Sequence, residues 1–312
     1  MDLLQNDYEK IRKWIYINAR PLDLARWKYH FEGGSKEDVL LSLSFYQNDD
    51  GGFGHGLELD CWNPNSNPMQ TWKATDILKE IDGCENDSKV TEGILRFLDS
   101  DKFFVDGYWN AVIPSNNDYP HAPWWSYYEG ANKDWGCNPS VSLAGFVILT
   151  ANRTSSIYKR AELLIKECTS EYINGGLLES MHESKCFVQL YDYLMKSKTN
   201  IIDLDKLKSK LIDQVNYCVC RDVSKWKTEY VCRPSFFING KDSIFYKDNK
   251  EVLNRELNFI IENLNDEGTW SINWNWNQYE KQWVLSENWW KAEIIINNLI
   301  LLRNFGKWGK SK

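Results

Sequence analysis

The amino-acid sequence predicts an all-α protein. Three observations support this fold class: apolar residues recur mostly at helical spacing, alternating strand-like patterns are nearly absent, and a unit of helix, glycine turn and helix recurs along the chain. We expect roughly ten to twelve helices from this periodicity. The 312 residues are enough for one large domain or two small ones, and we expect a single domain over residues 1–312.

Local signals mark three helix starts. Ser35 stands at an N-cap position before an apolar run. Asn67-Pro68 and Asn138-Pro139 each place an Asn cap before a proline at the first helical position, where the missing N–H is not needed. Apolar periodicity predicts further helices over 4–18, 86–99, 155–169, 183–197, 203–219, 250–264 and 287–304.

A short turn motif recurs four times. Residues 47–53 and 264–270 are the clear copies, and residues 105–109 and 173–177 are weaker ones. Each copy follows a helix and places Asp, Asn or Glu before Gly, with an aromatic residue or Leu after it. The glycine permits a positive-φ turn at a helix end, and we expect the aromatic residue to pack back between adjacent hairpins. Such hairpins must stack on one another, either as an open solenoid or as a closed ring.

The turn motif also carries a family resemblance. Residues 47–54, Gln-Asn-Asp-Asp-Gly-Gly-Phe-Gly, resemble the QW repeat of terpenoid cyclases and protein prenyltransferases. Residues 54–78 are similar to the stretch after this repeat in squalene–hopene cyclases, and residues 264–305 resemble a second turn with its inner helix. The resemblance implies a single-domain α/α toroid, in which helical hairpins surround a central aromatic-lined cavity.

The same resemblance implies a function. A relative of these enzymes would act on an isoprenoid or another polyene in the central cavity, by acid-initiated cyclisation or isomerisation. The sequence departs from the family because neither the Asp-x-Asp-Asp proton donor nor the magnesium-binding Asp-Asp-x-x-Asp motif is present. The fold that the resemblance implies is therefore better supported than the chemistry.

Composition restricts the partners. The chain has 37 Lys and Arg against 44 Asp and Glu, a net charge of −7 without a dense basic run, which argues against nucleic acid. No apolar run reaches the roughly 20 residues of a transmembrane helix, and the charged N-terminus is unlike a signal peptide. We expect a cytoplasmic protein with a small, hydrophobic substrate. The oligomeric state is not indicated.

The sequence indicates neither a cofactor nor a metal. It has no phosphate-binding glycine loop of the nucleotide-binding kinds, because residues 51–54 lack the following Lys-Ser/Thr and a preceding strand. The spacing of Cys218 and Cys220 differs from that of a zinc knuckle. By contrast, 16 Trp, 16 Tyr and 13 Phe exceed what an ordinary core needs, and such rings line cavities or interfaces.

The first candidate site is the loop after the turn at residues 47–53. Glu58 and Asp60 form a carboxylate pair there, with His55 and Trp62 beside them and Trp72 in the next helix as substrate contacts. In an aromatic cavity the pair would raise one pKa, which would leave a protonated acid near neutral pH. The alternative is that both carboxylates cap helices or pair with Lys or Arg.

The second candidate site is the aromatic segment 119–129. His121 would act as a base near neutral pH, and Trp124, Trp125 and Tyr128 would stabilise a cation or stack on a flat ring. The alternative is a packed loop with a hydrogen-bonded histidine.

The third candidate site lies near the C-terminus. Trp274 and Trp276 alternate in a short extended run, and Glu287, Trp290 and Lys291 share one helix face. Glu287 is the catalytic candidate and the three tryptophans are substrate contacts. The alternative is packing between repeats and an ordinary surface ion pair.

Two further functions stay open from sequence alone. One is a carbohydrate-active α/α-barrel lyase or hydrolase, in which two carboxylates act as acid and base. The other is a non-catalytic ligand-binding toroid. The lining of the cavity distinguishes them, since a sugar site is polar and open whereas an isoprenoid site is apolar and closed.

Overall fold

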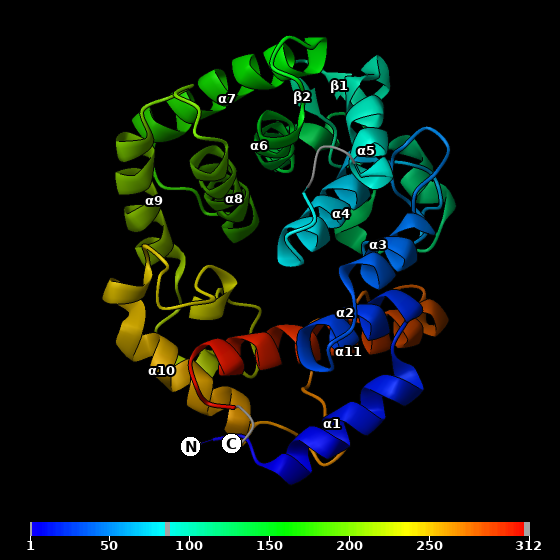
Figure 1. Ribbon diagram of the computed structural model, residues 1–312, viewed down its shortest axis with the longest axis vertical. Coiled ribbons are helices and arrows are strands. Elements are labelled where there is room, and N and C mark those ends of the chain that lie inside the picture. Colours follow the sequence, from blue (N-terminus) through cyan, green and yellow to red (C-terminus); the bar gives the residue numbers. More distant parts are fainter. Residues whose placement is uncertain (1, 85–87, 309–312) are drawn as a thin grey trace. The chain divides into compact units, whose positions relative to one another are not determined.

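The protein is all-α, as the sequence predicts. A computed structural model describes residues 2–84 and 88–308, and this part of the chain contains eleven α-helices and one short β-hairpin (Figure 1). The helices are α1 (Gln5–Asn18), α2 (Pro21–Phe31), α3 (Lys36–Ser44), α4 (Pro68–Glu80), α5 (Lys89–Asp99), α6 (Ser140–Thr150), α7 (Ser156–Asn174), α8 (Met181–Ser197), α9 (Leu204–Cys218), α10 (Tyr246–Glu262) and α11 (Glu280–Asn304). The hairpin pairs β1 (Phe104–Val105) with β2 (Tyr108–Trp109).

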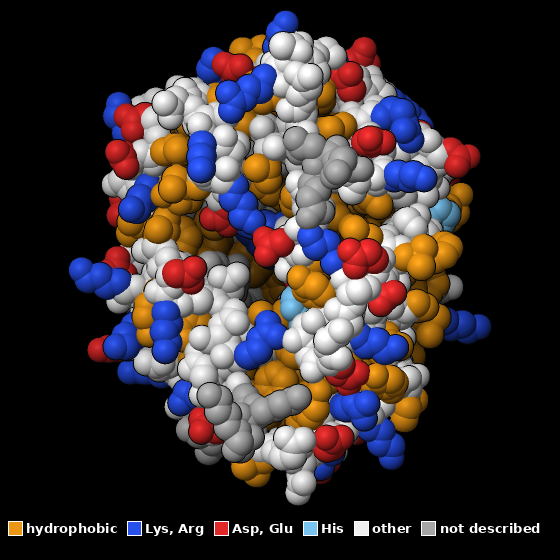
Figure 2. Space-filling view, viewed as in Figure 1, with side chains coloured by type: hydrophobic (Ala, Val, Ile, Leu, Met, Phe, Trp, Pro, Cys, Tyr) orange, Lys and Arg blue, Asp and Glu red, His pale blue; other side chains and the backbone are white. Residues whose placement is uncertain are grey.

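The chain forms two compact units. Unit 1 combines Met1–Ser42 with Val215–Lys312, and unit 2 is Leu43–Gln214. The single domain over 1–312 and the closure of the helices into a toroid stay predictions. On the face drawn in Figure 2, Lys and Arg side chains are interspersed with Asp and Glu side chains.

The helix-start signals are right at two positions and wrong at one. The Ser35 hydroxyl accepts from the Asp38 N–H at 3.1 Å, and the Asn67 side chain accepts from the Gln70 N–H at 2.8 Å. Asn138 does not cap α6, because α6 starts at Ser140 with Pro139 in the cap position. The Asn138 Oδ1 instead accepts from the Cys186 thiol at 3.3 Å.

Apolar periodicity missed one helix and shortened several others, since α7 extends to Asn174 rather than residue 169 and α10 begins at Tyr246 rather than residue 250. Helix α2 has Pro21 at its first position, but it buries the charged residues Asp23 and Arg26 on its inner face, and these interrupt the apolar pattern. Helix α11 begins at Glu280 rather than at residue 287. Helix α5 begins at Lys89, and residues 86–87 of the expected helix lie outside the described residues.

Unit 2 is built in two layers around α6. Helix α6 contacts α4, α7 and α8, and α5 contacts α7, so that α4, α6 and α8 form one layer and α5 and α7 the other (Figure 1). Nearly every residue of α6 is buried, as expected of a helix that is apolar all round. Gly145 allows α8 to approach, because a Cβ there would lie 3.2 Å from the Leu190 Cα.

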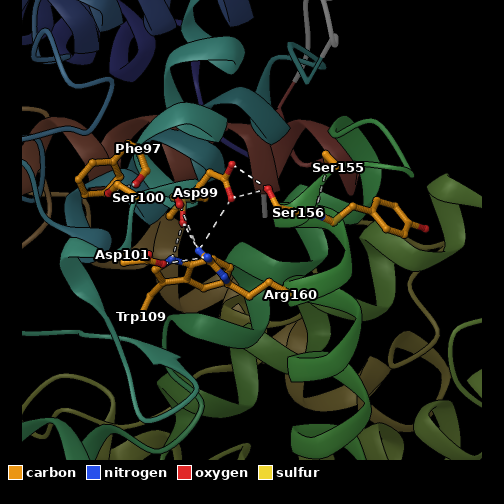
Figure 3. Close-up of polar contacts among 10 residues, drawn as sticks. Phe97, Asp99, Ser100, Asp101, Trp109, Ser155, Ser156 and Arg160 are labelled. Atoms are coloured by element: carbon orange, nitrogen blue, oxygen red, sulfur yellow. Dashed lines mark hydrogen bonds and ion pairs between the residues drawn. The ribbon is translucent and has the colours of Figure 1, made fainter.

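Arg160 of α7 fixes the two layers at the end of α5 (Figure 3). Its guanidinium donates to the Asp101 carboxylate at 2.9 Å and to the Leu98 carbonyl at 3.4 Å. The Ser156 hydroxyl donates to the Asp99 carboxylate at 3.1 Å, and the Trp109 indole donates to the Leu98 carbonyl at 3.2 Å. The Leu98 carbonyl, one of those that a helix end leaves unpaired, is thereby satisfied.

Three of the four repeated turns form as positive-φ turns. Gly51, Gly107 and Gly268 have φ values of 92°, 90° and 86°. The tryptophan after the last turn packs on the preceding helix, because the Trp270 indole donates to the Ile260 carbonyl at 2.7 Å. In unit 2 the Trp109 indole likewise donates to the Leu98 carbonyl of the helix before it. The copy at residues 173–177 is wrong, since Gly175 has a φ of −84° and only caps α7.

In unit 1, α11 is the central helix. It contacts α1, α2 and α10. Its buried Glu293 forms an ion pair with Arg26 of α2, and Arg26 and Arg20 both bond Asp23. Breaking a buried pair of this kind costs about 3–5 kcal/mol, so these charges fix how α2 lies on α11.

The turn at residues 47–53 should tolerate no side chain at Gly51. A Cβ there would lie 2.0 Å from the Gly93 carbonyl oxygen, whereas one at Gly107 has nothing within 4 Å. Both glycines have a positive φ of about 90°, which a residue with a Cβ adopts at a cost. Gly107→Ala should therefore cost about 1–2 kcal/mol of unfolding free energy. Gly51→Ala should cost a further 1–3 kcal/mol or so, as measured by urea denaturation. Equal losses in the two variants would contradict the close contact.

Candidate functional site

A buried amide network holds the loop that carries the carboxylate pair. The Gln70 side chain accepts from the Leu57 N–H at 2.9 Å and donates to the Asn63 carbonyl at 2.8 Å. The Asn63 side chain donates to Asn116 Oδ1 at 2.9 Å. Because these amides satisfy backbone groups that the fold buries, the loop has a fixed path and positions Glu58 and Asp60.

The first and second candidate sites come together in unit 2. Cys61 and His121 are paired in an antiparallel β-bridge. The Ala122 N–H donates to the Asp60 carbonyl at 2.8 Å, and the Trp62 N–H donates to the Pro120 carbonyl at 2.9 Å. Two segments that lie about 60 residues apart in the sequence are therefore joined side by side.

Glu58 is a buried acid whose proton is held tightly. Burial raises the pKa of Glu58 well above its ordinary value, and the neighbouring Asp60 carboxylate raises it further. The Asp60 N–H donates to Glu58 Oε2 at 2.7 Å, and the buried Lys73 ammonium opposes the rise. The pair therefore has the property expected from its sequence, a carboxyl group that stays protonated at a higher pH than usual.

Trp125 is a buried neighbour of this acid pair. Its side chain is only 7% exposed, and its ring stacks on Trp135 with centroids 4.9 Å apart and planes at 7°. The Trp125 indole N–H lowers the pKa of Glu58, because it favours the ionised carboxylate. The indole is not close enough or not aligned enough for a hydrogen bond, and it has no hydrogen-bond partner among the described residues.

The His121 ring has a hydrogen-bond partner at each of its two nitrogens. Its Nδ1 lies 2.6 Å from the Tyr119 carbonyl and its Nε2 lies 3.0 Å from the Ser126 hydroxyl. A carbonyl oxygen only accepts, so Nδ1 carries the proton, and in the neutral ring Nε2 accepts from Ser126. The histidine is hydrogen-bonded within its loop, as its alternative reading proposed, yet it also contacts a wall residue of a cavity.

A cavity of about 340 Å³ opens at this loop. Its wall combines aromatic rings with hydroxyl, amide, carboxylate and imidazole groups. The wall residues are Pro123, Trp124, Ser126, Tyr128, Ala131, Asp134, Trp135, Asn138, Ser180 and His182.

The polar groups of the wall differ in how they are held. The Tyr128 hydroxyl donates to the Asp134 carboxylate. Asn138 is buried, with its Oδ1 engaged by the Cys186 thiol. The His182 side chain is exposed to solvent. The protein atoms near its ring and the positive charge of Lys185 both lower the pKa of His182.

The remaining residues of the first group lie elsewhere in unit 2. His55 is exposed and its Nε2 lies 2.9 Å from Asn48 Oδ1. Trp62 is half-buried beside the bridge, and neither residue belongs to the cavity wall. Trp72 lies between α6 and α8, where its indole donates to Gln189 Oε1 at 2.9 Å.

The third candidate group lies in unit 1. Trp274 and Trp290 meet edge to face with centroids 5.2 Å apart, while Trp276 is fully buried and packs on Trp283. Glu287 forms an ion pair with Lys291 at 2.9 Å. These contacts match the packing alternative, and the proposed catalytic and binding roles of the group stay predictions.

The sequence did not identify several of the wall residues as site residues. Ser126, Trp135, Asn138 and His182 belong to the cavity wall, and the buried Lys73 lies near Glu58. Ser126 does lie within the aromatic segment 119–129, five residues after His121. Only the folded path of the loop shows that its hydroxyl meets the imidazole.

The findings on metal sites, membrane-spanning helices and related proteins are all negative. In the part of the chain that the structure describes, no group of three or more His, Cys, Asp and Glu side chains is arranged to hold a metal ion. Within the same residues, no helix combines the length and the apolar character that a bilayer crossing requires. Comparison with family models, curated proteins and solved structures finds no match.

The raised pKa of Glu58 should affect stability. The folded protein holds the Glu58 proton more tightly than the unfolded chain, whose carboxyl titrates near 4.5. The contribution of Glu58 to unfolding free energy therefore falls as the pH rises above that value. We expect Glu58→Gln to make the unfolding free energy depend less on pH between about pH 5 and 8, as measured by urea denaturation at a series of pH values.

A matched variant controls for the loss of one negative charge. Glu129 is an exposed carboxylate in the same unit, and Glu129→Gln should keep the wild-type pH dependence. If Glu58→Gln also keeps it, Glu58 does not hold its proton as described.

Proposed function

We propose that this protein binds a small, hydroxylated, ring-shaped molecule of the carbohydrate class in the cavity of unit 2. One observation carries the proposal: a single cavity of about 340 Å³ combines three aromatic side chains with hydroxyl, amide and carboxylate groups. Small-molecule sites have this combination of flat apolar surface and a few directed polar groups.

The aromatic part of the wall suits the apolar faces of a sugar ring. Trp124 and Tyr128 are 41% and 56% exposed, so their ring surfaces are accessible to a ligand. Trp135 is supported from behind by Trp125, which fixes its orientation. A ring that is held before binding loses little conformational entropy when the ligand arrives.

The polar part of the wall suits hydroxyl groups. Ser126 and Ser180 offer hydroxyls that both donate and accept, Asn138 offers an amide, and Asp134 offers a carboxylate. Each of these groups has one protein partner and further hydrogen-bonding capacity. A hydrocarbon ligand would displace water from that remaining capacity without replacing the hydrogen bonds, which disfavours its binding. The lining therefore favours the carbohydrate alternative over an isoprenoid in this cavity.

The proposal is tested by saturation-transfer difference NMR with a panel of monosaccharides and disaccharides, and with farnesol as the isoprenoid probe. We expect magnetisation transfer to the C–H groups of at least one sugar. Trp124→Ala should weaken that binding by about 3- to 10-fold, the contribution of one aromatic contact.

Phe45→Ala is the matched control, because Phe45 is 76% exposed and lies outside the cavity wall. It should leave sugar binding unchanged. Binding of farnesol with no binding of any sugar would contradict the proposal and would favour the isoprenoid function instead.

A further inference from the structure

We infer that Ser126 is a nucleophile activated by His121, and that the protein hydrolyses an ester of a carbohydrate. This inference rests on the proposed carbohydrate site for its substrate class. The catalytic pair itself follows from the geometry of the two side chains at the cavity.

The pair has the arrangement of an activated serine. Ser126 Oγ lies 3.0 Å from His121 Nε2, within the range for proton transfer from a nucleophile to its base. On the far side of the ring, the Tyr119 carbonyl accepts from Nδ1 at 2.6 Å. That contact leaves the Nε2 lone pair directed at the serine hydroxyl, the orienting role that a third group has in catalytic triads.

The base is rigid and the nucleophile is accessible. His121 is 5% exposed, and its backbone is fixed by the bridge to Cys61. Ser126 follows the short turn Pro123–Trp125, where its N–H donates to the Pro123 carbonyl, and its side chain is part of the cavity wall. A ligand in the cavity therefore meets the hydroxyl while the imidazole stays behind it.

The same wall provides a donor for the charge that develops in acyl transfer. Asn138 contributes to the cavity wall, and its Oδ1 accepts from the Cys186 thiol. This contact leaves the amide nitrogen of Asn138 as the group that can donate to a ligand. Side-chain amides of this kind stabilise the oxyanion of tetrahedral intermediates.

The acidic residues argue for an ester rather than a glycosidic bond. Glycoside hydrolysis needs two carboxyl groups on either side of the scissile bond. Among the described residues of the wall, Asp134 is the one carboxylate, and it accepts from the Tyr128 hydroxyl. Neither Glu58 nor Asp60 belongs to the cavity wall. One serine–histidine pair suffices for an ester.

The reaction takes place in two balanced steps. Ser126 Oγ bonds to the acyl carbon as its proton moves to His121 Nε2, and the carbonyl π electrons move to the oxygen. When they return, the ester C–O bond breaks and the sugar alkoxide leaves with the proton from Nε2. Water then attacks the acyl–serine with Nε2 again as base, which releases the carboxylic acid and restores Ser126.

The experiment uses the full chain in two assays. The first measures acetate release from glucose pentaacetate and sucrose octaacetate. The second treats the protein with phenylmethylsulfonyl fluoride, in which Oγ bonds to sulfur and fluoride leaves, and locates the adduct by peptide mass spectrometry. We expect hydrolysis by the wild type and an adduct on Ser126.

Ser126→Ala should lower the hydrolysis rate by at least about 1000-fold, as loss of an activated nucleophile does, and should abolish the adduct. The urea denaturation midpoint of Ser126→Ala should match that of the wild type, which shows that the variant is folded. Ser170→Ala, an exposed serine on α7, should match the wild type in every assay.

The outcomes separate the two proposals. Sugar binding without hydrolysis and without an adduct on Ser126 overturns the nucleophile and leaves the binding site intact. An adduct on Ser126 without binding of any sugar supports the nucleophile and overturns the carbohydrate class. Hydrolysis that persists in Ser126→Ala overturns the inference directly.

Discussion

The candidate site depends on a short backbone pairing between residues 60–62 and 120–122. This bridge has three residues on each side, yet it joins two loops from different helical hairpins. It places Glu58 and Asp60 next to Trp125, and it fixes His121 against Ser126. The amide network of Gln70, Asn63 and Asn116 supports it from the side of the loop. The site is therefore a property of two loops held together, rather than of any one helix.

The fold was predictable to the extent that its signals are local. Asn67 and Ser35 start helices as expected because a cap requires only a side chain and the next turn of backbone. Asn138 failed for the opposite reason, since its side chain is engaged by Cys186 of α8, about 50 residues away. Helix α2 was missed because its inner face carries Asp23 and Arg26, whose burial makes sense only with their ion-pair partners.

The site was predictable in its residue types but not in its connections. The sequence indicated a carboxylate pair and an aromatic loop with a histidine, and unit 2 brings these two groups together. It did not indicate Ser126, because a serine is informative only when its neighbour in space is known. The cavity wall also combines polar side chains with aromatic rings, and this combination depends on which loop side chains face the cavity.

The stacked pair of Trp125 and Trp135 has an optical consequence. In two indole rings that lie nearly parallel with centroids 4.9 Å apart, the strong far-ultraviolet transitions are coupled. Such coupling gives two circular dichroism bands of opposite sign in the far ultraviolet, in addition to the signal of the separate rings. Because Trp135 borders the cavity, a change in these bands reports on a change of the stacked pair without an added label.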